Sequence, residues 1–419
     1  RDLKPLLPAA AAIFVAGMLP VSGLVPFSFQ AISTVADRYL YLSMLGPALA
    51  LAWVLAYSRR MSLAVGCGLL LLSLLAVMSV FQVQYWRNET TLFTHALEVN
   101  PRSWISHNNI GKARFEEGKI DEAIEHYQQA LLANPRYSKS HNNLGNALAA
   151  KGELEKAVES YRKALTIGPR DPTVHNNLGL VLVAQGKVDE AIEQFRQALK
   201  IDATYAGAHF NLGNALAMSG RLEQAIEQYR QTLDNDPTFA AGHVALGNAL
   251  AAAGKLEQAI EHYRQALAIE PKGENAHLNL GLALAGLGQT EEAIKELRRV
   301  LELENSAGML SQTHFSLGTI FAKQGHLDEA GKQFEQALKL NPDFARARHY
   351  MGRGLEARRG LNKAIDYYQQ AVRSDPELAE AHQSLGEALA KQGRRDEAIE
   401  HYQIALQILK ARRKAADGH

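Results

Sequence analysis

The sequence predicts an all-α protein in which transmembrane helices precede a helical solenoid. Its first quarter contains long runs without a charged residue, and the remainder repeats with a period of 34 residues, lengthened once by three. A fixed period of this length indicates stacked repeats with a helix–turn–helix as the unit. Two lattices of small residues, twelve positions apart, mark the repeats: Gly111, Gly145, Gly179, Gly213, Gly247, Gly281, Gly318, Gly352 and Gly386, and Ala123, Ala157, Ala191, Ala225, Ala259, Ala293, Ala330, Ala364 and Ala398.

Residues 1–86 are predicted to form a membrane segment of about three transmembrane helices. Residues 5–36, 40–57 and 62–81 carry no charged side chain, and ~20 apolar residues suffice for a helix to cross the hydrocarbon core. We expect helices near residues 6–25, 39–57 and 62–84. Because Pro8, Pro20 and Pro26 interrupt the first of them, a re-entrant segment is the alternative there.

The cationic residues predict the orientation of this segment. Arg59 and Arg60 lie in the turn between the second and third helices, and Arg1 and Lys4 precede the first. The positive-inside rule places these residues in the cytoplasm and the repeats on the extracytoplasmic side. We therefore expect a multipass membrane protein, of the bacterial inner membrane. Since the chain starts at Arg1 in apolar sequence without a signal-peptide pattern, we also expect a longer protein to precede it.

Residues 87–103 are predicted to be half a repeat that joins the membrane segment to the solenoid. Phe93, Ala96 and Pro101 match the aromatic, small and proline positions of a second repeat helix. Residues 88–90 read Asn-Glu-Thr, which is an N-glycosylation pattern. Because they lie so close to the membrane, we interpret them as the start of a helix.

The residues of each unit suit two closely packed helices, as residues 138–171 illustrate. Gly145 and Ala157 are small enough for the helices to approach, and Gly152 breaks the chain between them. Small residues at the eighth and twentieth positions, an aromatic at the twenty-fourth and a terminal proline resemble the tetratricopeptide (TPR) repeat. The resemblance implies a right-handed TPR α-solenoid of nine repeats over residues 104–412, followed by a polar tail at 413–419. We expect the three extra residues near 305–310 to interrupt the stacking register.

The membrane segment carries a second resemblance. Residues 37–42 read Asp-Arg-Tyr-Leu-Tyr-Leu, which is similar to the junction of transmembrane O-mannosyltransferases with TPR tails and their bacterial relatives. That family usually continues with proline, where this chain has Ser43 and Met44. The resemblance implies that the catalytic acidic pair lies upstream of Arg1, so no residue here is assigned to catalysis. Arg38 either pairs with Asp37 at the membrane interface or contacts the phosphate of a lipid-linked sugar.

A row of asparagines is the candidate peptide-binding site. These residues lie two positions before the lattice glycine, on the first helix of five of the first six repeats, with Ala245 as the interruption. A carboxamide offers a donor and an acceptor, which matches an extended peptide backbone. The row resembles the asparagine ladder of O-linked N-acetylglucosamine transferases. Bonding between neighbouring helices, with a role in the stack alone, is the alternative. The asparagines are Asn109, Asn143, Asn177, Asn211 and Asn279.

Two further sets of residues recur on the first helices. Eight repeats carry a histidine four positions before the glycine, which suggests metal binding or, because each lies on a separate repeat, structural packing. The histidines are His107, His141, His175, His209, His243, His277, His314 and His382. In repeat eight, arginines indicate either a solvated cationic face or a patch for an acidic ligand or lipid headgroup. They are Arg346, Arg348, Arg353, Arg358 and Arg359.

Composition narrows the functional classes. The net charge of +1 gives no indication of nucleic-acid binding, and the lone Cys67 excludes an internal disulfide framework. No nucleophile–base pair, phosphate loop or metal spacing is found, so we expect neither cofactor nor metal. The sequence favours a membrane-anchored TPR scaffold that binds proteins or extended peptides. The alternative is the acceptor-recruiting tail of a membrane glycosyltransferase that uses a lipid-linked sugar, and a third is an assembly scaffold of the cell envelope.

Overall fold

The structure, a computed structural model, describes residues 88–303 and 306–417, and every regular element in this part is an α-helix. The chain divides into two compact units between Ala215 and Leu216, within one helix. The predicted membrane segment, with Asp37 and Arg38, lies outside the described residues. Within the described ranges, no helix is both long enough and apolar enough to cross a membrane.

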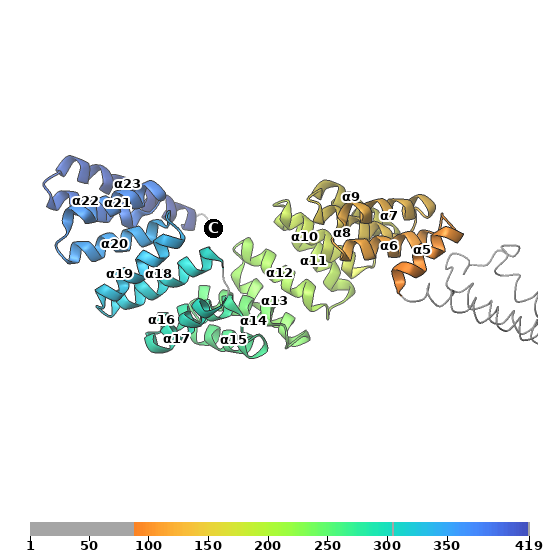
Figure 1. Cartoon of the computed structure of the whole chain (residues 1–419), viewed down its shortest axis with the longest axis horizontal. Coiled ribbons are helices and arrows are strands. Elements are labelled where there is room, and N and C mark those ends of the chain that lie inside the picture. The colour runs from red at the N-terminus through yellow and green to blue at the C-terminus, as the bar shows by residue number, and fades with distance from the viewer. Residues whose placement is uncertain (1–87, 304–305, 418–419) are drawn as a thin grey trace, which may run out of the picture. The chain divides into compact units, whose positions relative to one another are not determined.

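In its described residues, the first unit has a single helix followed by antiparallel pairs (Figure 1). Within a pair the two helices contact each other, and the second helix contacts the first helix of the next pair, as α7 does with α8. Its helices are α5 (Glu89–Val99), α6 (Trp104–Glu116), α7 (Ile120–Ala133), α8 (Ser138–Ala150), α9 (Leu154–Ile167), α10 (Pro172–Ala184), α11 (Val188–Ile201) and α12 (Ala206–Met218), in which the division falls.

The second unit repeats the same arrangement. Its helices are α13 (Leu222–Asn235), α14 (Ala240–Ala252), α15 (Leu256–Ile269), α16 (Glu274–Gly286), α17 (Thr290–Glu302), α18 (Ala307–Lys323), α19 (Leu327–Leu340), α20 (Ala345–Ala357), α21 (Leu361–Ser374), α22 (Ala379–Lys391) and α23 (Arg395–Asp417). Contacts join α14 to α15, α15 to α16 and α14 to α16. Each pair therefore packs against the next pair in the chain, which buries the apolar face that one hairpin leaves open.

The lattice glycines allow the two helices of a pair to come close. A Cβ added at Gly145 would lie 2.6 Å from the ring of Tyr161, and one added at Gly352 would lie 2.5 Å from the ring of Tyr368. Both rings are almost fully buried, with exposed fractions of 2% and 0%. The predicted reason for a small residue at this position is therefore confirmed, because any side chain would overlap the aromatic residue of the second helix.

The turn between paired helices has a left-handed residue. Glycine occupies this place with φ between 75° and 85° at Gly118, Gly152, Gly186, Gly220, Gly254, Gly288, Gly325 and Gly393. In repeat eight the same place is taken by Arg359, with φ of 63°. A side chain with a Cβ is strained in this conformation, so repeat eight departs from the others at its turn.

The first described helix and the helix that contains the insertion each begin at a side chain that caps the helix. Asn88 is the N-cap of α5, because its side chain accepts a hydrogen bond from the Thr91 amide at 2.8 Å; the interpretation of residues 88–90 as a helix start is confirmed. Ala96 of this helix is buried, and α5 contacts α6. The insertion before Gly318 lengthens α18, which spans 17 residues and still contacts α16 and α17. The lengthened helix therefore still packs against the preceding pair.

Candidate functional site

The predicted asparagine row is part of a hydrogen-bonded network between adjacent repeats. The Nδ2 of Asn143 on α8 donates to the Oδ1 of Asn108 on α6 at 3.1 Å. The same oxygen accepts from the hydroxyl of Ser140 at 2.9 Å. Asn108 and Ser140 are buried, whereas Asn143 is half-buried. The half-buried Asn143 is thus held by a buried asparagine of the preceding repeat.

The next repeats use the same bond. Asn177 donates to Asn142 at 3.2 Å and to Asn146 at 3.1 Å. Asn211 donates to the buried Asn176 at 2.9 Å. The bond recurs because the two asparagines of each pair are 35 residues apart, one repeat plus one position. This spacing places donor and acceptor on neighbouring first helices.

Tyrosines of the second helices anchor part of the network. The hydroxyl of Tyr161 donates to the Oδ1 of Asn146 at 2.7 Å, so this oxygen receives both the tyrosine and the Asn177 amide. In the second unit Tyr263 donates to Asn248 at 2.8 Å, and Asn279 donates to the same oxygen at 2.8 Å. Burial raises the pKa of Tyr263 to about 12, which keeps the hydroxyl protonated as a donor.

Each row asparagine retains a carbonyl that no described protein group uses. In four of these residues the Nδ2 atom donates a hydrogen bond to the preceding repeat, and no protein donor within the described residues reaches the Oδ1 atom. They are Asn143, Asn177, Asn211 and Asn279. Asn109 has no earlier full repeat and donates to the Ile105 carbonyl of its own helix at 2.9 Å. The row can therefore present acceptors in fixed orientations to a ligand that carries N–H donors.

Sequence reasoning found the row but missed its supporting residues. Asn108, Asn142 and Asn176 directly precede row members, so the Asn-Asn pairs were visible in the sequence. Both readings of the row are compatible with the geometry: the amide nitrogen supports the stack, and the carbonyl oxygen accepts no hydrogen bond from the described residues.

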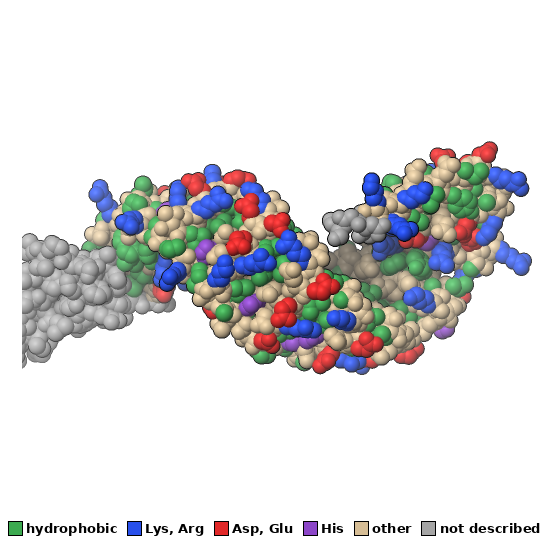
Figure 2. Space-filling model, turned by 180° about the vertical axis from the view of Figure 1, so that it is seen from behind, with side chains coloured by type: hydrophobic (Ala, Val, Ile, Leu, Met, Phe, Trp, Pro, Cys, Tyr) green, Lys and Arg blue, Asp and Glu red, His purple; other side chains and the backbone are tan. Residues whose placement is uncertain are grey.

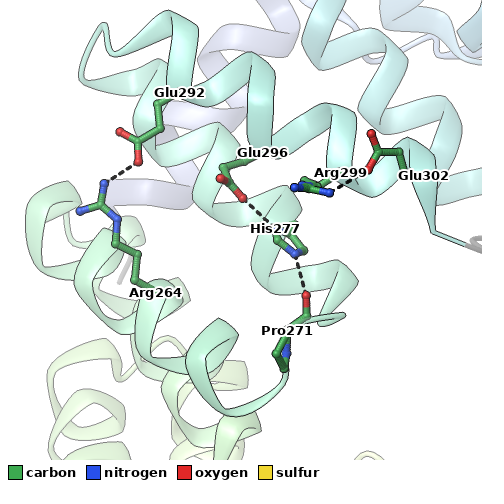
Figure 3. A network of polar contacts seen from close by, with 7 residues as sticks. All are labelled: Arg264, Pro271, His277, Glu292, Glu296, Arg299 and Glu302. Atoms are coloured by element: carbon green, nitrogen blue, oxygen red, sulfur yellow. Dashed lines mark hydrogen bonds and ion pairs between the residues drawn. The ribbon is translucent and has the colours of Figure 1, made fainter.

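The recurring histidines fix the turns between repeats. In seven of them Nε2 lies 3.0–3.2 Å from a backbone carbonyl six residues earlier, that of Pro101, Pro135, Pro169, Ala203, Pro237, Pro271 or Pro376. Figure 3 shows one case, in which His277 lies between the Pro271 carbonyl and Glu296, whose Oε2 is 2.7 Å from Nδ1. The ring ties the incoming turn to the second helix of its own repeat.

Three of these histidines contact a second histidine 19 residues later. The Nδ1 atoms of His107 and His126, and those of His243 and His262, are 3.1 Å apart, and those of His382 and His401 are 3.0 Å apart. Burial, together with the neighbouring ring, lowers the pKa of His126 and of His262. Within residues 88–303 and 306–417, no three His, Cys, Asp or Glu side chains are grouped as a metal site.

The five arginines predicted as one patch make separate contacts. Arg348 donates to Ser374 on α21 and lies 3.6 Å from Asp343. Arg358 forms an ion pair with Asp328 of α19. Arg353 lies over the ring of Tyr350, 5.7 Å from its centroid. Arg346 is exposed, and Arg359 occupies the left-handed turn position. Two of the five guanidinium groups, those of Arg348 and Arg358, therefore contact neighbouring helices.

Opposite charges alternate over the described surface. On the face drawn in Figure 2, Lys and Arg side chains are interspersed with Asp and Glu. Several of them form ion pairs between repeats, such as Lys151 with Asp121 at 2.8 Å and Arg264 with Glu292 at 2.7 Å. Exposed pairs of this kind contribute little to stability, so the asparagine network is the more specific feature of the first helices.

Comparison with known proteins identifies the repeats. A family model described as the C-terminal domain of cilia and flagella-associated protein 70, a TPR domain, matches residues 95–282, and a tetratricopeptide-repeat model matches residues 274–343 and 340–411. The protein O-mannosyl-transferase Tmtc3 of Drosophila melanogaster is 32% identical over 132 residues, which are 30% of this chain and 13% of that protein. The chain thus matches only a small part of that relative.

One solved structure shares the fold over much of this chain, and a second is similar over a smaller part. The Cut9–Hcn1 complex of the anaphase-promoting complex is similar over 70% of this chain and 56% of that chain, with 18% identity and a TM-score of 0.50. YrrB, described as a TPR protein with an unusual peptide-binding site, covers 44% of this chain and 95% of its own at 26% identity and a TM-score of 0.37. The carboxy-terminal part of this chain consists of TPR repeats, and its described residues form an all-α TPR solenoid.

Proposed function

We propose that this protein is a membrane-anchored scaffold that binds extended segments of other proteins along its asparagine row, on the extracytoplasmic side of the membrane. One observation carries the proposal: each row asparagine uses its Nδ2 within the protein and leaves its Oδ1 open. A run of oriented acceptors suits the N–H groups of an extended backbone. Such groups are common to all sequences, so binding depends little on ligand side chains.

The test separates the stack from the ligand. Replacing Asn143, Asn177 and Asn211 with Ala removes both atoms of each carboxamide. Replacing the same residues with Asp keeps an outward oxygen but removes the donor to the preceding repeat. The probes are two labelled unstructured peptides of identical composition and different order, offered to the full chain and followed by fluorescence anisotropy.

We expect the Ala variant to weaken binding of both peptides by ~0.5–1.5 kcal/mol for each lost hydrogen bond. The Asp variant should lose stability and retain measurable binding. If the Ala variant binds both peptides as the wild type does, with a lower melting temperature, the asparagines serve the stack and the proposal is wrong.

Membrane anchoring has its own test. The proposal places the repeats outside the cytoplasm, on the strength of the uncharged runs before Phe81 and of Arg59 and Arg60 between two of them. A cysteine introduced as Gly418→Cys, in a Cys67→Ser background, should react with a membrane-impermeant maleimide in intact spheroplasts. Reaction only after lysis would place the repeats in the cytoplasm.

A second candidate function is supported by the resemblance to Tmtc3. Because 132 residues of this chain are 32% identical to a protein O-mannosyl-transferase, the solenoid is a candidate for the part that recruits acceptor proteins to such an enzyme. The catalytic groups would then belong to another part of the protein. Transfer of mannose to a bound acceptor, lost with the Asn→Ala variant, would support this function, and the absence of any glycosyl transfer by the full-length protein would exclude it.

A further inference from the structure

A cavity of about 920 Å³ lies between the seventh and eighth repeats, within the second unit. Its walls come from α18, α19 and α20, and it includes Leu327, Phe334, Tyr350, Met351 and Leu355. A volume of this size falls within the ~300–1,000 Å³ typical of ligand sites. Exposed lining residues show that it opens to solvent.

The cavity exists because two residues are missing their usual side chains. In the other eight repeats the position after the lattice alanine carries Ile or Val: Ile124, Val158, Ile192, Ile226, Ile260, Ile294, Ile365 and Ile399. In six of these repeats the side chain is buried, as with Ile294 at 7% and Ile365 at 4% exposure. Repeat seven has Gly331 there, and a Cβ added at Gly331 would meet no atom within 4 Å.

The opposite wall shows the same change. Gly354 of α20 occupies a position that is Ala, Val or Ile in the other repeats. A Cβ added at Gly354 also meets nothing within 4 Å. Glycine weakens a helix interior by ~1 kcal/mol relative to alanine. Two such glycines facing one space therefore leave an apolar volume that the other repeats fill with their own side chains.

The walls are apolar and aromatic. Phe334 is buried, and its ring centroid is 5.5 Å from that of Tyr350, which closes one side. Tyr350 replaces a row asparagine in this repeat. The guanidinium of Arg353 lies over the Tyr350 ring, 5.7 Å from its centroid. An aromatic wall that ends in a cation suits an apolar group next to a carboxylate.

The charges at the rim differ between helices. Lys323 comes from α18 and Arg353 from α20, and the ion pairs of this region use Arg348, Arg358 and Lys391 instead. The acidic lining residues Asp328, Glu329 and Glu335 all belong to α19, which also contributes Lys332, and Asp328 is already paired with Arg358. The side formed by the first helices α18 and α20 is thus cationic.

We propose that this cavity is an anchor pocket for one large apolar side chain of a partner protein, and that acidic residues flank this side chain in the partner. The apolar group would fill the space left by Gly331 and Gly354, and its acidic neighbours would contact Lys323 and Arg353. The pocket shares with the proposed function only the premise that the repeats bind polypeptides. It uses none of the row asparagines.

Restoring the usual residue tests the anchor pocket. Gly331→Ile fills the space without a clash at its Cβ, so the variant should fold and gain stability. The probes are a fluorescent peptide with one Leu between Asp and Glu residues and the same peptide with Ala in place of Leu. The wild-type chain should bind the Leu peptide about 10- to 100-fold more tightly than the Ala peptide. Gly331→Ile should abolish this difference, and Arg353→Gln should reduce the affinity and its dependence on salt.

Each remaining outcome decides the matter. Equal affinity of the wild type for the two peptides, no binding of either, or unchanged discrimination by Gly331→Ile would overturn the proposal. The variant with Asn143, Asn177 and Asn211 replaced by Ala is the matched control, because it alters the other unit. It should keep the Leu/Ala discrimination, whereas it should lose the unstructured peptides. Loss of the Leu/Ala discrimination in this control would contradict the anchor pocket as a site separate from the row, whereas unchanged binding of the unstructured peptides would contradict the asparagine row alone.

Discussion

Two glycines of repeat seven provide a controlled measurement of steric packing. Gly318 and Gly331 both lie inside helices, so Gly→Ala gains helix propensity of ~1 kcal/mol at either place. At Gly318 the new Cβ would lie 2.6 Å from the Phe334 ring, far inside van der Waals contact, whereas at Gly331 it meets nothing within 4 Å. The two variants therefore differ in the clash alone.

The magnitude follows from how little the ring can move. Phe334 is 3% exposed and packs against Phe315, with 5.9 Å between ring centroids, and against Tyr350. Overpacking such a site costs ~1–3 kcal/mol. Subtracting the gain in propensity, we expect Gly318→Ala to destabilise the repeat by ~0–2 kcal/mol. Gly331→Ala should stabilise it by ~1 kcal/mol.

Amide hydrogen exchange is the appropriate assay. Repeats couple mainly to their neighbours, so a single melting temperature would average over the array. Protection of α19 amides should fall in Gly318→Ala and rise in Gly331→Ala, while amides of α6 and α7 remain unchanged. Indistinguishable protection in the two variants would refute the argument that the aromatic residue enforces glycine at this position.

Three further predictions concern other sites. Arg359→Gly should raise the local free energy of unfolding by ~0.5–1 kcal/mol, because a φ of 63° is unfavourable for a residue with a Cβ. Gly325→Arg should lower the local free energy of unfolding in repeat seven for the same reason. Amide protection measured by hydrogen exchange should therefore rise in the first variant and fall in the second. Burial lowers the pKa of His349 to about 4 from the usual 6.5. The unfolded chain therefore binds more protons than the folded chain between these pH values, and the free energy of unfolding should fall by ~3 kcal/mol as the pH drops from 6.5 to 4. In denaturant titrations, His349→Gln should not show this loss of stability at low pH. Asn108→Ala should cost ~1–3 kcal/mol because it strands two donors, whereas Asn109→Ala, which loses one bond to its own helix, should be nearly neutral in the same titrations.

The recurring glycines and alanines could be predicted from the sequence because they mark where the backbones of the two helices in one repeat come close. Gly145 and Tyr161 recur together, and the structure explains the pairing by direct contact. The left-handed turns were predictable for the same reason, since glycine at Gly152 has few other uses between helices. These features depend on residues a fixed number of positions apart within one unit.

Contacts across repeats were harder to predict. The row asparagines were recognised, but their bonds to Asn108, Asn142 and Asn176 join residues 35 positions apart, a spacing that no single-helix periodicity shows. The arginines of repeat eight appeared as one patch because they are close in sequence. Arg348 and Arg358 instead contact helices on either side of α20, which depends on the packing of three helices.

The insertion shows a similar limit. Three extra residues were expected to disturb the stack, yet α18 begins at Ala307 and absorbs them as an additional turn. Sequence length alone does not reveal whether an insertion forms a loop or extends a helix. The N-cap Ser306, whose side chain accepts from the Met309 amide at 3.3 Å, determines the outcome here.

The direction of the asparagine bonds has a consequence for how such an array changes in length. In the first unit the three bonds between asparagines 35 residues apart run from a later repeat to the one before it, from Asn143 to Asn108, from Asn177 to Asn142 and from Asn211 to Asn176. A tandem duplication of one 34-residue unit would create an additional repeat with both asparagines. The amide nitrogen of its row asparagine would donate to the asparagine of the preceding repeat, and the carbonyl oxygen of its other asparagine would accept from the row asparagine of the following repeat. Unequal crossing-over within this stretch of the gene would therefore add or remove whole repeats without leaving an asparagine donor or acceptor of these bonds unpaired. Where Ser316, Tyr350 and Ser384 replace the asparagine, a duplicated unit would not reproduce this carboxamide bond.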